Sequence, residues 1–148
     1  MSQIFTANEL VHALALLVAS ALEGVTVYEE CLPDPALTRP APKAPLAVVQ
    51  SISGTDSRDG STVQINIAIE RAMTDDDDIV RVHKTIRDDI AAVKLAIYHN
   101  PTGCIGGTHP GQAAWTVYDA DMRPAVQARI SITFEVPHPV YENGEFLV

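Results

Sequence analysis

The chain has 148 residues, of which 47% are hydrophobic and 20% charged, a composition that suits one domain built around a single hydrophobic core. This composition excludes a chain that is disordered throughout, because the apolar content is high enough to offset the entropy lost on folding. Ten basic residues against nineteen acidic residues give a formal net charge of −9. This charge disfavours tight binding to nucleic acid or to an anionic membrane surface.

Neither a membrane span nor a secretion signal is predicted. The longest apolar stretch, residues 10–22, is shorter than the roughly 20 residues that cross a bilayer. No Lys or Arg precedes Arg39, so the basic leader of a signal peptide is missing and we expect the protein to stay in the cytoplasm where it is made. The two cysteines, Cys31 and Cys104, are expected to be reduced thiols.

The first predicted elements are a helix and a short strand. Thr6 and Glu9 have the spacing of a capping box, and leucines follow at helical intervals. Gly24 then supplies a stop signal. We therefore expect a helix at residues 7–23 and a strand at residues 25–29.

Residues 31–45 contain five prolines, which predict an extended crossover. We expect this crossover to lie within one domain, because neither side of it has a plausible core of its own. Residues 46–53 alternate loosely and residues 61–71 alternate strictly between apolar and polar side chains. With the turn-rich segment 54–60 between them, these two runs predict a β-hairpin.

The second half of the chain predicts a helix and two more strands. Asp75–Asp78 precede a stripe of apolar residues at helical spacing, and four aspartates favour the positive end of a helix dipole. The glycine- and proline-rich segment 100–112 is expected to be a loop. Residues 113–118 and 125–136 are expected to be strands, and the second of them alternates strictly.

These elements predict an α+β fold in the order helix, strand, proline-rich crossover, two strands, helix, two strands. The sheet is expected to be mostly antiparallel, with both helices packed on one face and the other face polar or covered by a partner. Residues 1–136 form the single predicted domain. Residues 137–148 are expected to be a tail that is apolar enough to dock on another surface.

No pattern in the sequence predicts catalysis or metal binding. Cys104 and His109 invite a thiol or metal interpretation, but no paired metal-ligand spacing accompanies them. The glycine-rich run 103–107 follows a helix and leads into a strand, which is the wrong context for a phosphate-binding loop. Asp75–Asp78 lack the spacing of a calcium loop. We therefore expect no enzyme activity, cofactor or metal.

The order of elements, ending in the strand ISITFEV at residues 130–136, resembles the tail terminator family of long-tailed bacteriophages. The resemblance covers about residues 7–136. It implies a hexameric ring that stops tail-tube polymerisation, with the tail tube protein and the head-tail connector protein as partners. DNA would pass through the lumen without specific binding. The resemblance also implies a place in the tail or neck of the virion, after assembly in the host cytoplasm.

The expected assembly surface includes the polar sides of two strands, the glycine-rich loop and the tail. We expect strands 61–71 and 125–136, together with the tail, to extend a sheet between neighbouring subunits. The turn 54–60 and the loop 100–112 are expected to project toward tube or connector. The alternatives are another phage neck or head-tail joining protein, a small ligand-binding α+β domain, or a small enzyme whose residues meet only in the fold. The candidate interface residues are Gln64, Asn66, Glu70, Ile105, His109, Arg129, Thr133, Tyr141 and Phe146.

Overall fold

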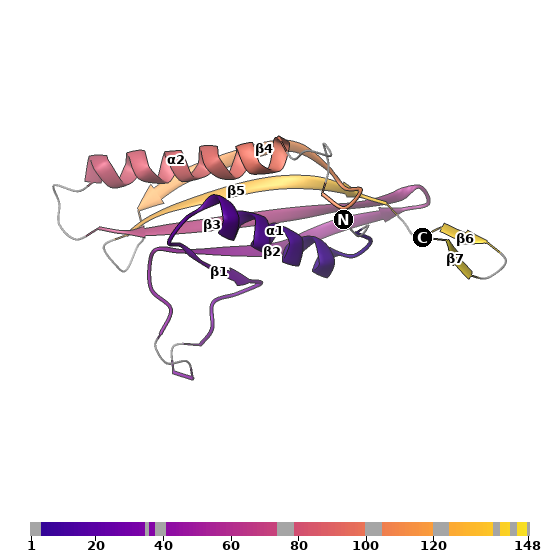
Figure 1. Ribbon diagram of the computed structural model, residues 1–148, viewed down its shortest axis with the longest axis horizontal. Coiled ribbons are helices and arrows are strands. Elements are labelled where there is room, and N and C mark those ends of the chain that lie inside the picture. The colour runs from indigo at the N-terminus through magenta and orange to yellow at the C-terminus, as the bar shows by residue number, and fades with distance from the viewer. Residues whose placement is uncertain are drawn as a thin grey trace.

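The computed structural model describes residues 4–34, 36–37, 41–73, 79–99, 105–119, 125–137, 140–142 and 145–147. The two helices and the five strands of the main sheet occur along the chain in the predicted order, and a small hairpin follows them (Figure 1). The elements are α1 (Ala7–Ala21), β1 (Thr26–Glu29), β2 (Leu46–Ser57), β3 (Gly60–Ala72), α2 (Ile79–Tyr98), β4 (His109–Asp119), β5 (Ala125–Val136), β6 (Val140–Glu142) and β7 (Glu145–Leu147).

The main sheet has five strands in the order β1-β2-β3-β5-β4. The short strand β1 runs parallel to β2, and every other neighbouring pair is antiparallel. The predicted α+β class with a mostly antiparallel sheet is therefore confirmed. The strands β6 and β7 pair with each other in a separate hairpin.

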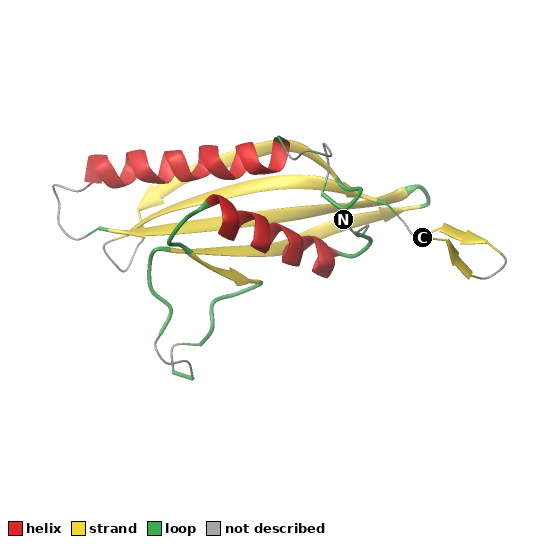
Figure 2. Cartoon of the chain, in the orientation of Figure 1, coloured by secondary structure: helices red, strands yellow, loops and turns green. Residues whose placement is uncertain are grey.

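One face of the sheet carries the core, and both helices pack on it (Figure 2). Helix α1 contacts β1 and β2, α2 contacts β3, β4 and β5, and the two helices touch each other. Alternating strand residues point into this layer because side chains along a strand alternate between the two faces. Its largest fully buried side chains include Leu10, Leu14, Ile65, Ile67, Ile69, Ile86, Ile97, Ile130, Ile132 and Phe134.

Helix α1 begins at the predicted cap. The amide of Glu9 donates to the Thr6 hydroxyl at 3.1 Å, which satisfies one of the amides that a helix start leaves unpaired. The helix ends at Ala21, two residues before the predicted end, and Gly24 follows with φ of 77°. This left-handed conformation suits glycine and turns the chain into β1.

Gly54 and Gly111, which were expected to lie in a turn and a loop, lie inside strands. The turn of the β2–β3 hairpin contains only Arg58 and Asp59, so the predicted turn at 54–60 was too long. A Cβ on Gly54 would lie 2.8 Å from the Thr62 carbonyl oxygen, and one on Gly111 would lie 3.0 Å from the Thr133 carbonyl oxygen. Both glycines therefore permit a close approach of backbones, and β4 begins at His109 instead of residue 113.

Candidate assembly surfaces

The face of the sheet opposite the helices carries polar side chains that bond to each other across strands. The Ser131 hydroxyl donates to Asn66 Oδ1 at 2.7 Å, and Gln127 Nε2 donates to Glu70 Oε1 at 2.8 Å. Asn66 is only 6% exposed and Glu70 only 5%. Because these groups find partners within the chain, the open face does not require another protein to satisfy them.

Five of the predicted interface residues meet on this open face. Gln64 pairs in register with Thr133, and Arg129 lies opposite Ala68, between the two bonded pairs described above. Arg129 and Thr133 are exposed, and Gln64 is half-buried. The alternation in the sequence therefore correctly predicted one shared face for Gln64, Asn66, Glu70, Arg129 and Thr133. It did not predict the hydrogen bonds of Asn66 and Glu70 across strands, because these bonds depend on the register between β3 and β5.

The two predicted residues of the glycine-rich loop lie in different surroundings. Ile105 is 3% exposed and belongs to the core, so its side chain is not part of the subunit surface. The segment at Ile4 lies against this loop, since the Ile4 amide donates to the Gly106 carbonyl at 2.6 Å. His109 is exposed at the start of β4, opposite Glu135. Only His109 is available to a partner.

Two hollows flank the β2–β3 hairpin near its turn. On the open side, a hollow of about 420 Å³ is lined by residues that include Thr62, His109 and Glu135. A second hollow of about 530 Å³ lies beside the start of α1 and is lined by residues that include Phe5 and Ile52. This end of the sheet is therefore indented on both sides of the hairpin.

Tyr141 and Phe146 are paired in the backbone register of the β6–β7 hairpin. Figure 1 shows this hairpin beyond the end of the main sheet, close to the β2–β3 turn. The two predicted tail residues are thus held on neighbouring strands of one small element.

The strands with free edges are not the ones that the sequence suggested. Strands β3 and β5 lie inside the sheet with a neighbour on each side, so the prediction that they extend the sheet between subunits is wrong. One outer edge is β4. The other is β1, which ends opposite Val49, so that β2 itself forms the edge from residue 50 to 57. An unpaired strand edge is a ready site for pairing with another chain.

Helix α2 is attached along the β4 edge by three side chains. Lys94 Nζ lies 5.9 Å from the centroid of the Trp115 ring, a cation–π distance. His83 Nε2 lies 3.3 Å from Asp119 Oδ1, and the Tyr98 hydroxyl donates to a β4 backbone carbonyl. Burial raises the pKa of Tyr98. These three contacts hold one side of α2 against the outer strand β4.

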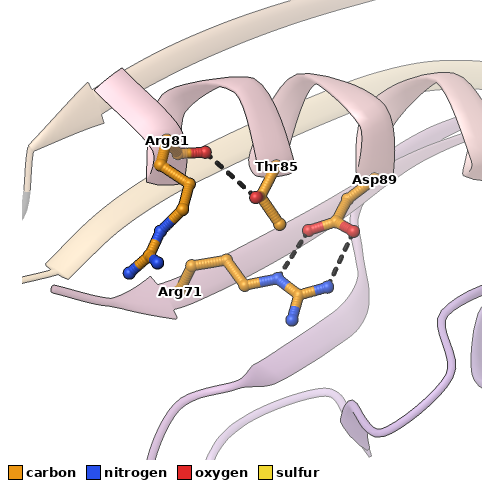
Figure 3. Close-up of polar contacts among 4 residues, drawn as sticks. All are labelled: Arg71, Arg81, Thr85 and Asp89. Carbon is orange, nitrogen blue, oxygen red and sulfur yellow. Dashed lines mark hydrogen bonds and ion pairs between the residues drawn. The ribbon is translucent and has the colours of Figure 1, made fainter. Parts of the chain in front are cut away.

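A partly buried ion pair that the sequence patterns did not predict joins β3 to α2 (Figure 3). Arg71 Nε and Nη2 donate to the two carboxylate oxygens of Asp89 at 2.7 and 2.8 Å. The hydrogen bond to Asp89 raises the pKa of Arg71. One turn earlier, the Thr85 hydroxyl donates to the Arg81 carbonyl at 3.0 Å. Arg71 continues the series of β3 residues that point toward the helices. Its place in this alternation could have predicted that its side chain lies on the helix side of the sheet and needs a partner there.

Among the described residues, no group of His, Cys, Asp or Glu side chains is arranged to hold a metal ion. Cys104 and Asp75–Asp78, two sequence candidates for metal binding, lie outside the described residues. None of the described helices is long and apolar enough to cross a membrane.

Comparisons with known proteins establish no family for the chain. No family model matches it, and no curated protein matches it in sequence. Among solved structures, the chain is similar to one from the virion of a native gene transfer agent particle, with 16% sequence identity, 84% of each chain covered and a TM-score of 0.42. A similarity of this size assigns neither a family nor a function.

Proposed function

We propose that this protein is a tail terminator, a ring of identical subunits that caps the tube of a phage-like tail and joins it to the head connector. The observation that carries the proposal is the pair of outer strands, β4 on one side of the sheet and β1 with residues 50–57 of β2 on the other, neither of which has a further strand neighbour among the described residues. A subunit with a different surface on each side can join its copies head to tail, and such a chain closes as a ring when the rotation between neighbouring copies completes a full turn.

The two ends of the sheet suit two different partners. One end combines the Arg58–Asp59 turn, the hollows beside it and the β6–β7 hairpin (Figure 1). The opposite end, where β3 stops at Ala72 and β5 starts at Ala125, lacks the hairpin turn and both hollows. On this proposal one end contacts the tail tube protein and the other contacts the connector.

The charge of the chain suits a passage for DNA. A net charge of −9 repels phosphate groups, so DNA would pass through the centre of the ring without being held. The protein would act through assembly, with no catalytic residue, cofactor or metal. It would belong to the tail or neck of the virion, after assembly in the host cytoplasm.

Native mass spectrometry of the purified protein, with negative-stain class averages, tests the ring directly. We expect a discrete hexamer with a central hole. The purified protein is then added to polymerising tail tube protein, with an equal amount of an unrelated acidic protein as the control. A terminator shortens the tubes and is seen at one of their ends.

The same assay separates the alternatives. A neck or head-tail joining protein would form a ring but leave tube length unchanged, and it would bind the connector alone. A ligand-binding domain would remain a monomer or dimer, and tubes would not recruit it. Either result would replace the terminator proposal.

A further inference from the structure

Resting on the proposed function, we infer that the ring is closed by two oppositely charged side surfaces of the subunit. The basic edge consists of Arg87, Lys94 and Trp115, on α2 and β4. The acidic edge consists of Leu16, Glu23 and Glu29, on α1, β1 and the turn between them. The basic edge of one copy binds the acidic edge of the next copy.

The charges of the chain are separated between these two sides. No Lys or Arg precedes Arg39, so α1 and β1 contain no Lys or Arg, while Glu23, Glu29 and Glu30 are all exposed. Helix α2 has four basic residues and two acidic residues, and one of the acidic residues, Asp89, is bound to Arg71. In a protein with a net charge of −9, α2 is therefore an unusual concentration of positive charge. Opposite charges on two surfaces favour the encounter of those surfaces.

Each edge also exposes one large apolar side chain. Leu16 is 61% exposed, and it lies one helical turn after His12, the α1 residue that contacts Glu29. Trp115 is 47% exposed beside Lys94. An apolar side chain flanked by charged groups is the usual composition of a protein interface, in which aromatic anchors are enriched.

The register of the sheet puts Lys94 and Glu29 at the same level along the strands. Lys94 lies over the Trp115 ring, and His12 Nδ1 is 2.9 Å from Glu29 Oε2, so both charged groups lie on the helix side of the sheet. Two copies placed side by side without a shift along the strands thus bring Lys94 of one copy opposite Glu29 of the other. The row of paired residues that crosses the sheet at this level is Trp115, Ile130, Ile67, Val49 and Glu29.

A second pair of charges follows in the same direction. Arg87 precedes Lys94 by seven residues, about 10 Å along the helix at 1.5 Å per residue, toward the end of β4 at Asp119. On the other edge, β1 starts at that end of the sheet, and Glu23 lies in the turn just before it. The arrangement therefore sets Arg87 near Glu23 when Lys94 faces Glu29.

The strand directions are compatible with this contact. Strand β1 is parallel to β2, and three successive antiparallel pairings lead from β2 to β4, so β1 and β4 run in opposite directions. Neighbouring copies would therefore present antiparallel edges to each other, the orientation in which two edge strands pair most readily.

Charge-reversal variants of the full chain test the inference. In one variant Arg87→Glu and Lys94→Glu reverse the basic edge, and in the other Glu23→Lys and Glu29→Lys reverse the acidic edge. Each variant alone is expected to self-associate about a hundredfold more weakly than the wild type, because like charges then face each other. An equimolar mixture is expected to recover the wild-type mass, because every contact in an alternating ring again joins opposite charges.

Arg58→Glu and Asp59→Lys, in the exposed hairpin turn, are the matched controls and should leave the mass unchanged. Thermal melts verify that all variants fold, and added salt should weaken self-association of the wild type. A ring that neither reversal weakens, a mixture that does not recover, or a wild type insensitive to salt would overturn the inference while leaving the terminator proposal standing. A wild type that stays monomeric would also overturn it, and the tube-length assay would then decide the proposed function separately.

Discussion

The two faces of the sheet use neighbouring residues for opposite purposes. Ile65, Ile67 and Ile130 point into the helix layer and are fully buried, while Asn66 and Ser131 point to the other side and bond to each other. One face supplies the hydrophobic stabilisation of the fold. The other face satisfies its own polar groups and leaves exposed side chains such as Arg129 in water. We therefore expect substitutions on the open face to cost less stability than substitutions on the helix face.

The largest expected effect comes from the charged pair on the helix face. Asp89 is 6% exposed, and Arg71→Met leaves its carboxylate without its ion-pair partner. We expect the free energy of unfolding to fall by about 4 kcal/mol, because a buried charge that loses its partner is strongly destabilising. Urea denaturation measures the change.

The double variant Arg71→Met with Asp89→Leu is the control for this prediction. Replacing a buried ion pair with apolar side chains is often neutral, so the double variant should recover most of the lost stability. A double variant as unstable as Arg71→Met would show that the pair is not the cause.

A second comparison uses two adjacent residues of β5. Ile130→Ala should lower the free energy of unfolding by about 3 kcal/mol, because it leaves a cavity in the core. Arg129→Ala, on the open face, should change it by less than about 0.5 kcal/mol. Equal effects in denaturation experiments would mean that the open face is covered in the isolated protein.

The hydrogen-bonded pairs of the open face predict a smaller loss of stability. Ser131→Ala removes the donor to Asn66 Oδ1 and should cost about 1 kcal/mol, because Asn66 is nearly buried. Thr133→Ala, two residues further along the same face and exposed, is the matched control. If both variants unfold at the same denaturant concentration, the bond contributes nothing measurable.

The smallest effect concerns alkaline pH at the β4 edge. Burial raises the pKa of Tyr98 in the folded protein, so the unfolded chain loses this phenol proton first as pH rises above about 10. The stability that Tyr98 contributes is therefore complete below that pH and is lost as pH rises through the pKa of the folded state. Tyr98→Phe should show a weaker loss of stability above about pH 10 than the wild type. Identical pH profiles would contradict this assignment.

Sequence patterns predicted most of the fold but less of its surfaces. Strict alternation in β3 and β5 identified both faces, because a strand with one buried face fixes the direction of every side chain. Gly54 and Gly111 were interpreted as loop residues, since a sequence does not tell a glycine that permits close backbone approach from one that permits a turn. The order of strands also depends on long-range pairing. Only the structure therefore revealed that β4, not β3 or β5, has a free edge.

Both ends of the described chain lie near the β2–β3 turn. Ile4 bonds to Gly106 at this end, and the β6–β7 hairpin follows from β5 beside it (Figure 1). A label inserted next to Ile4 or Leu147 would therefore mark the same pole of every subunit. In electron micrographs of assembled particles, such a label would give the ring a readable orientation. It would also obstruct whichever partner binds at that pole, so tagged and untagged proteins should differ in binding one partner and agree in binding the other.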